Sequence, residues 1–426
     1  MVLDPTHIQF ISNHINDINT SVLQCTHKYE AERTDELLQR LKNIKVNNST
    51  MVHPLDNNIL YKADRAKIAK IDDLFKITYA IDSGTINPVT YTNGTVFDIC
   101  HGAMTCTPID HNIERYRTVN SIIYISDDQL NITSDMDWNM YDDGFARSSS
   151  LVISHNNLKS RIQETIHDLI MTFTESEHIL WMKDKIENNS ILFIDGSVYP
   201  KRTLYSVAAE DNFLPNMLKY DPTTERILQN YIDIANHGMD NNIPLLGIVK
   251  NPIDSQIMRS DTMKDFNIWK DDTQLFKYIL NSCKDDEIQK TGMTYTCWFW
   301  QPNRMYGTFV NKSSPLAGEN MQNVKYPEEF YDPVFFMIYI PRTHTIFKIE
   351  SLYGFIKQPD TRKQITQKIL REVALNGSIP QTLVNADHLA KINQYETSKL
   401  KDVVDKSVQM YDYNAHRWPE ITNGEI

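Results

Sequence analysis

The stretch Phe75-Lys-Ile-Thr-Tyr-Ala-Ile81, followed at once by Asp82-Ser-Gly-Thr, is the part of the sequence that decides the fold. Its β-branched and aromatic residues predict a strand, and the Asp-Ser-Gly that follows predicts that the strand ends at an acid. The same design recurs where Ile191-Leu-Phe-Ile194 runs into Asp195-Gly-Ser. Two such strands predict two carboxylates at one edge of a sheet, although each aspartate is also explained as the first residue of a turn.

Working outward, the pattern alternates between strands and helices. Strands are predicted at residues 95–99, 118–125, 244–250, 294–300, 334–340 and 345–350, and helices at 157–186, 223–237, 272–282 and from 359 to about 411. Residues 46–66 are polar and predict a loop. Residues 126–144 form a second polar segment. Three strands, then alternating helices and strands, predict an α/β fold that resembles a ribonuclease-H-like mixed sheet core flanked by helices.

The same pattern predicts three parts along the chain. Residues 1–66 read as a helical N-terminal arm and a loop, because Ile8, Ile11, Ile15 and Ile18 recur at helical spacing. Residues 67–392 hold the predicted sheet and its helices, and residues 393–426 read as a C-terminal helical tail.

Composition limits the classes of function. The chain has 426 residues, 41% of them hydrophobic, and a net charge of −12, so its surface as a whole does not attract nucleic acid or an anionic membrane. No apolar run approaches the roughly 20 residues of a membrane span, and the start lacks a secretory signal. The five cysteines form no Cys-x-x-Cys pair. We therefore expect a cytoplasmic protein without membrane association.

The acids predict metal chemistry if they meet. One carboxylate does not hold Mn²⁺ or Mg²⁺ against water, but several oxygen ligands in one cleft do. Two such ions activate a water and stabilise the leaving oxygen of a phosphodiester. The sequence contains no Gly-x-x-x-x-Gly-Lys-Ser/Thr, Gly-x-Gly-x-x-Gly, Gly-x-Ser-x-Gly or His-Glu-x-x-His motif, so ATP hydrolysis, dinucleotide chemistry, serine hydrolysis and zincin chemistry have no support.

Four blocks carry a family resemblance. They are Ala80-Ile-Asp-Ser-Gly-Thr-Ile-Asn-Pro88, Leu192-Phe-Ile-Asp-Gly-Ser-Val-Tyr-Pro200, Leu246-Gly-Ile-Val-Lys-Asn251 and Gly377-Ser-Ile-Pro-Gln-Thr-Leu-Val-Asn-Ala-Asp387. In this order and spacing they resemble the NurA family, nucleases of archaea and some bacteria, and the longer archaeal branch in particular.

The resemblance implies metal ligands. Asp82 and Asp195 match the two metal-binding aspartates of the family. The family also has a metal-binding glutamate on the helix before the second aspartate, and Glu164, Glu175 and Glu177 compete for that role. The spacing to Asp195 favours Glu175, while Glu164 lies close to three helical turns earlier and so faces the same side.

The resemblance also implies roles for later residues, and the sequence departs from the pattern near its end. Lys250 matches a lysine expected to contact phosphate. Asp272 matches a later acidic position, which either completes the metal cluster or caps a helix. The family often has a tyrosine and a histidine where this chain has Ile379 and Asp387, and we expect Asp387 to serve as a further ligand.

The resemblance therefore implies a deoxyribonuclease that uses Mn²⁺ or Mg²⁺. It implies 5′-to-3′ exonuclease and single-strand endonuclease activity in the resection of DNA double-strand breaks, a HerA-type hexameric ATPase as partner, and a homodimer. One alternative is a clamp or adaptor for a HerA-like ATPase, suggested by the altered C-terminal block. Another is a glycoside hydrolase that uses Asp82 and Asp195 as its carboxylate pair.

Overall fold

The chain folds into two compact units in the computed structural model, which describes residues 4–26, 30–46, 49–91, 94–125, 135–154, 162–200, 222–266, 269–283, 285–302 and 323–408. Unit 1 is formed by Met1–Asp64, Pro252–Phe299 and Met337–Ile346, and unit 2 by Arg65–Asn251, Trp300–Phe336 and Phe347–Ile426. The boundary falls inside three strands, β13 (Phe299–Trp300), β14 (Pro333–Ile340) and β15 (Thr345–Leu352). Among the described residues, no helix combines the length and the apolar character needed to cross a membrane.

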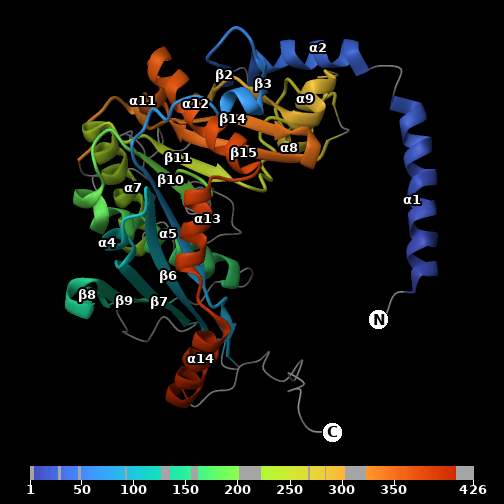
Figure 1. The fold of residues 1–426 in the computed structure, drawn as a ribbon. Helices are drawn as coiled ribbons and strands as arrows, with labels where there is room; N and C mark the ends of the chain where they lie inside the picture. The colour runs from blue at the N-terminus through green and yellow to red at the C-terminus, as the bar shows by residue number, and fades with distance from the viewer. Residues whose placement is uncertain are drawn as a thin grey trace. The chain divides into compact units, whose positions relative to one another are not determined.

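Unit 2 is built on a mixed sheet (Figure 1). Its strands follow the spatial order β15-β11-β10-β4-β6-β7-β9-β8, with the short β5 beside β6. The strands are β4 (Thr78–Thr85), β5 (Val89–Thr90), β6 (Val96–Thr107), β7 (Arg117–Ile125), β8 (Asp135–Tyr141), β9 (Ala146–Ser154), β10 (Ile191–Asp195) and β11 (Leu245–Val249). β4 is parallel to β10 and antiparallel to β6, and β10 is parallel to β11.

Helices cover both faces of this sheet. Consecutive residues of β6 contact different helices. His101 reaches Ala390 of α13 (Gln381–Ala390), whereas a Cβ on Gly102 would meet Thr174 of α5 (Ile162–Met182). Because side chains alternate along a strand, α13 and α5 lie on opposite faces. The other helices of unit 2 are α3 (Arg65–Ile68), α4 (His111–Glu114), α7 (Pro222–Asn241), α11 (Tyr353–Ile356), α12 (Pro359–Asn376) and α14 (Gln394–Val408), with 3₁₀ turns η1 (Asp142–Gly144), η2 (Lys183–Lys185) and η4 (Glu328–Tyr331).

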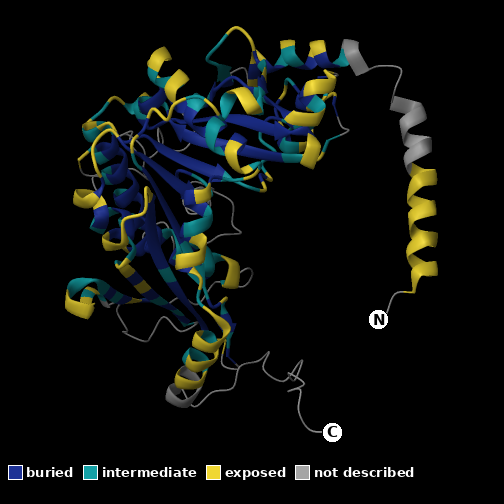
Figure 2. Ribbon diagram, in the orientation of Figure 1, coloured by how far each residue is buried: buried dark blue, intermediate teal, exposed yellow. Residues whose placement is uncertain are grey.

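The sheet is the buried centre of unit 2 (Figure 2). All five residues of β10 except Asp195 are buried, and β11 is buried except at Val249. Such continuous apolar strands are typical of parallel strands covered on both faces. The polar ends of these strands are therefore the places where side chains emerge from the core.

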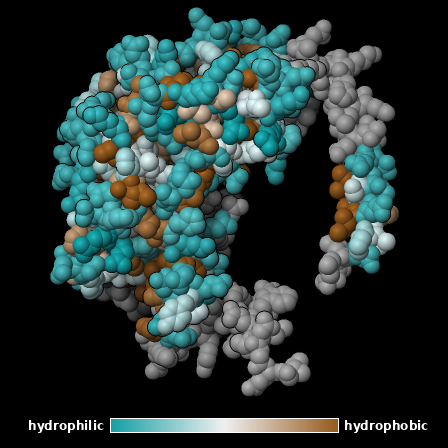
Figure 3. All heavy atoms as spheres, viewed as in Figure 1, coloured by the Kyte–Doolittle hydropathy of each residue, from teal (hydrophilic) through white to brown (hydrophobic). Residues whose placement is uncertain are grey.

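Unit 1 contains the N-terminal helices and a smaller set of strands. β3 (Leu60–Asp64) pairs with β12 (Gly292–Thr296), which pairs with β14, and β1 (Ile44–Val46) pairs with β2 (Ser49–Pro54). The helices are α1 (Pro5–Thr26), α2 (Glu30–Leu41), α8 (Asp272–Asn281) and α9 (Asp286–Thr291), with the 3₁₀ turn η5 (Pro341–Thr343). The apolar residues of α1, such as Ile8 and Ile11, are exposed and form a stripe along it (Figure 3).

The mixed α/β architecture confirms the predicted fold class at that level, but several predicted elements are wrong. Residues 46–66 are not a loop, because they form β2 and β3, and β3 is held by a partner more than 200 residues away. The described part of the polar segment 126–144 is a strand and a 3₁₀ turn, and β9 was not predicted at all. The three-part division of the chain stays a prediction. Of the predicted C-terminal tail, residues 409–426 lie outside the described residues.

Candidate active site

The two predicted aspartates lie side by side on neighbouring strands. Ile81 of β4 pairs with Ile194 of β10 in parallel register, so the next residues, Asp82 and Asp195, are adjacent. Asp82 is 6% exposed and forms a side-chain hydrogen bond with Asp195. β4 does not end at Asp82 but continues to Thr85 along β6, so this acid lies within a strand and not in a turn.

A third carboxylate approaches β4 from α5, where it contacts the residue that follows Asp82. Glu175 is 8% exposed, and its Oε1 accepts a hydrogen bond of 2.5 Å from Ser83 Oγ, the residue after Asp82. Burial, reinforced by repulsion from Asp195 and Glu175, raises the pKa of Asp82 to about 8. Burial and repulsion from Asp195 likewise raise the pKa of Glu175 to about 8, against the hydrogen bond from Ser83, which lowers it. The three acids thus interact electrostatically in a buried setting.

Lys250 is the cation of the cluster. It follows β11, which pairs with β10 so that Ile248 lies beside Asp195. Lys250 Nζ lies 2.5 Å from Asp195 Oδ2 and neutralises this acid, the most exposed of the three. In the described part of the chain, no three His, Cys, Asp or Glu side chains are already arranged to hold a metal ion. Lys250 contacts one of the two carboxylate oxygens of Asp195.

The competing glutamates of α5 lie elsewhere. Glu164 is exposed in the first turn, and eleven residues of helix place it about 16 Å from Glu175 along the axis. Glu177 Oε1 accepts hydrogen bonds from Arg226 Nε at 2.6 Å and Asn230 Nδ2 at 2.8 Å. Of the three candidates, Glu175 is therefore the one that contacts the residue next to Asp82.

The structure does not bring the two later acids into this cluster. Asp272 belongs to unit 1, where its buried carboxylate accepts hydrogen bonds from the backbone N–H groups of Ile257 and Met258 at 3.1 and 2.8 Å. Asp387 is exposed on α13, whose buried side holds Ala386 and Ala390. Their assignment as metal ligands stays a prediction without a contact to support it.

Sequence reasoning missed a second layer of polar residues around the acids. After Asp195 the chain turns at Gly196, whose φ is +104°, and Ser197 Oγ then donates a 2.5 Å hydrogen bond to Glu350 Oε2 of β15. Glu350 is 1% exposed and also pairs with Lys348 Nζ at 2.9 Å. The sequence Phe347-Lys-Ile-Glu-Ser351 places two charged residues on a strand that is otherwise apolar. This pattern could have indicated a buried ion pair.

A family model, the NurA domain, matches residues 76–392, which is most of the chain and includes all of these carboxylates. The chain belongs to the NurA family. None of the curated proteins compared with it matches. Among solved structures, NurA bound to dAMP and manganese is 12% identical with a TM-score of 0.49, and the match covers 93% of this chain and 97% of that one. The NurA nuclease from Sulfolobus solfataricus is 11% identical with a TM-score of 0.45, covering 96% and 99%.

Proposed function

We propose that this NurA family protein is a metal-dependent deoxyribonuclease whose site is formed by Asp82, Glu175 and Asp195. The observation that carries the proposal is the proximity of these three carboxylates, from β4, α5 and β10, in a buried setting, where burial and then mutual repulsion raise the pKa of Asp82 and Glu175 to about 8. Such clustering is costly without a cation, and strongly shifted pKa values of this kind concentrate at functional sites. Family membership supplies the substrate class, DNA.

The donor set fits Mn²⁺ or Mg²⁺, because carboxylate oxygens are hard ligands of the kind that both ions prefer. Two of the solved NurA structures contain manganese, and we propose that this chain binds the same ion. When bound, such an ion supplies an activated water and neutralises charge on the phosphodiester. Asp82, Glu175 and Asp195 would hold it.

The remaining residues orient the site. Ser83 holds Glu175, and the contact between Ser197 and Glu350 fixes the turn that follows Asp195. Lys250, once released from Asp195, is placed to contact a phosphate oxygen at the same strand ends. We assign the core to the ribonuclease-H-like class, supported by the strand order β7-β6-β4-β10-β11 with β6 alone antiparallel to both of its neighbours.

The finer assignments rest on the family resemblance. We propose 5′-to-3′ exonuclease and single-strand endonuclease activity in double-strand break resection, in a cytoplasmic protein of archaeal type that forms a homodimer and works with a HerA-type hexameric ATPase. Such a motor would deliver the strand, which suits a chain whose net charge of −12 gives no strong intrinsic attraction to DNA.

The test is cleavage of labelled DNA with Mn²⁺, with Mg²⁺ and with EDTA. Asp82→Asn and Glu175→Gln should abolish cleavage, whereas Glu164→Gln, a matched change in the exposed first turn of the same helix, should retain it. Circular dichroism checks that each variant is folded. Full activity of Asp82→Asn would refute the assignment.

An adaptor without nuclease activity is the second candidate. It is favoured by the ion pair between Lys250 and Asp195, which occupies one of the acids, and by the exposed Asp387 in place of the family's histidine. The adaptor function would be supported if the folded protein shows no metal-dependent cleavage but still stimulates a HerA-type ATPase. Glycoside hydrolysis is disfavoured, since Asp82 and Asp195 share a hydrogen bond, whereas glycosidase carboxyl groups lie roughly 5 Å or more apart.

A further inference from the structure

A second concave site lies in unit 2. A pocket of about 820 Å³ is formed by β6, β7 and the segment that joins α13 to α14. This volume lies within the range of sites that bind small ligands. None of the proposed metal ligands is among the described residues that line it. The proposed chemistry therefore does not account for the pocket.

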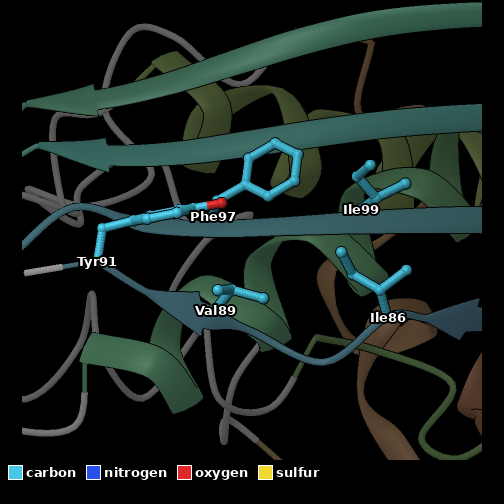
Figure 4. Close-up of a cluster of buried hydrophobic side chains, with 5 residues drawn as sticks. All are labelled: Ile86, Val89, Tyr91, Phe97 and Ile99. Carbon is cyan, nitrogen blue, oxygen red and sulfur yellow. The ribbon is translucent and has the colours of Figure 1, made fainter. Parts of the chain in front are cut away.

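The pocket has an apolar wall. Val119 and Leu389 are each 37% exposed there, which is unusual for branched apolar side chains without a partner. Ile99 anchors the wall to a buried cluster in which it packs with Ile86, Val89, Tyr91 and Phe97 (Figure 4). Ile392 and Leu400 of the C-terminal segment pack against that same cluster. The wall is thus continuous with the core of the unit.

The lining of the pocket carries a small excess of positive charge, because it holds four basic side chains and three acidic ones. Arg115, Lys391 and Lys399 line it, and none has an acidic partner within ion-pair distance among the described residues. The three acids of the lining are engaged: Glu114 with Thr105 and His111, Asp142 with Arg117, and Glu396 with the N–H of Asn393. In a chain with a net charge of −12, a small excess of cations beside an apolar wall favours an anionic ligand that also has an apolar part.

His101 adds a directional feature. Its Nδ1 lies 3.0 Å from the carbonyl oxygen of Ala390, which can only accept, so Nδ1 carries the proton. Burial lowers the pKa of His101, which keeps the ring neutral and makes Nε2 an acceptor. Nε2 is buried and has no hydrogen-bond partner among the described residues. A ligand with an N–H group can supply the missing donor.

The sheet register links this pocket to the carboxylates. Asp82 pairs with Ala103 of β6, and Ala103 pairs with Arg117 of β7. Directly paired residues point to the same face, and neighbouring strands are about 4.8 Å apart, so Arg117 lies roughly 10 Å from Asp82 along one row of the sheet. This row joins the strand that bears Asp82 to the wall of the pocket beneath α13, which packs on β4 and β6.

We propose that the pocket binds a nucleotide unit of the DNA strand, with its base against Val119 and Leu389 and its phosphate at Arg115, Lys391 and Lys399. The proposal deepens the nuclease function and rests on it for the identity of the ligand. The pocket adds a contact with DNA away from the phosphodiester that is cut. Such a contact positions a long substrate but does not change the rate of hydrolysis of a small substrate that cannot reach the pocket.

Binding is measured with a fluorescein-labelled single-stranded oligonucleotide by anisotropy in EDTA, over a series of salt concentrations. The variants are Lys391→Ala/Lys399→Ala, Val119→Trp and, as a matched control on α12, the exposed Lys363→Ala. The pocket is proposed to hold one phosphate, so the double variant should make the slope of log K against log salt shallower by at most about 0.7. Val119→Trp should weaken binding without changing the slope. All three should hydrolyse bis(4-nitrophenyl) phosphate with Mn²⁺ at the wild-type rate.

Two results overturn the proposal. One is a double variant with the same affinity and salt slope as Lys363→Ala. The other is a Val119→Trp variant that no longer binds dAMP but binds the oligonucleotide with wild-type affinity. The pocket would then bind free mononucleotides and not a unit of the DNA strand. The readout does not depend on cleavage. A wild-type protein that binds DNA through the pocket but never cleaves it would refute the nuclease assignment and leave this one standing.

Discussion

Replacing Asp82 by asparagine should stabilise the metal-free protein at alkaline pH. The pKa of Asp82 rises from 3.8 to about 8 on folding, chiefly because the side chain is buried and then because Asp195 and Glu175 repel its charge. Between about pH 4 and pH 8 the folded carboxyl keeps a proton that the unfolded one has lost. The free energy of unfolding of the wild type therefore falls as pH rises through this window.

The size of the effect follows from the shift. About 4 pKa units at about 1.4 kcal/mol each give a maximum of about 6 kcal/mol. Relaxation of the site and entry of water reduce this, so we expect Asp82→Asn to be more stable than wild type by about 2 kcal/mol at pH 9 and roughly equal at pH 4. That corresponds to a rise of a few degrees in the thermal midpoint.

The assay is thermal unfolding in EDTA, followed by circular dichroism from pH 4 to pH 9. The exposed Asp387→Asn serves as a control for the loss of one negative charge. Added Mn²⁺ should raise the midpoint of the wild type but not that of Asp82→Asn, since the ion replaces the protons held by the acids. If wild type and Asp82→Asn lose stability in parallel from pH 4 to pH 9, the reasoning about this cluster is wrong.

Three further predictions address other residues. Lys250→Met should tighten Mn²⁺ binding in calorimetry, because Asp195 loses its competing partner, while kcat falls; unchanged affinity would contradict the competition. Asp272→Ala should leave cleavage intact but lower the free energy of unfolding by about 1–3 kcal/mol, as two buried N–H groups lose their acceptor; loss of cleavage in a folded variant would place Asp272 in the site after all. Ser197→Ala and Glu350→Gln should each weaken Mn²⁺ binding, and the double variant should be no worse than the more affected single one, as expected if they act as a unit; fully additive effects would rule out that coupling.

The sequence predicted the parts of the fold that local pattern determines. The runs that became β4, β10 and β11 are apolar and end in polar residues, so their existence and the adjacency of Asp82 and Asp195 could be inferred. Spacing to Asp195 also favoured Glu175, the glutamate that contacts Ser83.

What failed depended on partners distant in the chain. β3 is a strand because it pairs with β12, and nothing in its own polar sequence indicates this. Asp272 reads as an acid available for metal, yet it holds backbone N–H groups of a preceding loop. The role of Glu350 depends on Ser197, 153 residues earlier, and no local period encodes such a contact.

The packing of α13 on β4 has a consequence for how this part of unit 2 opens. A Cβ on Gly84 would lie 2.5 Å from the carbonyl oxygen of Ala390, and Thr382, at the other end of the helix, bonds Thr107, which pairs with Thr78. Residues 381–390 thus cover the face of β4 that bears Asp82. Because residues 381–390 complete the packing of this strand, the backbone amides of β4 should lose their protection against hydrogen exchange when α13 detaches, before the rest of the sheet opens.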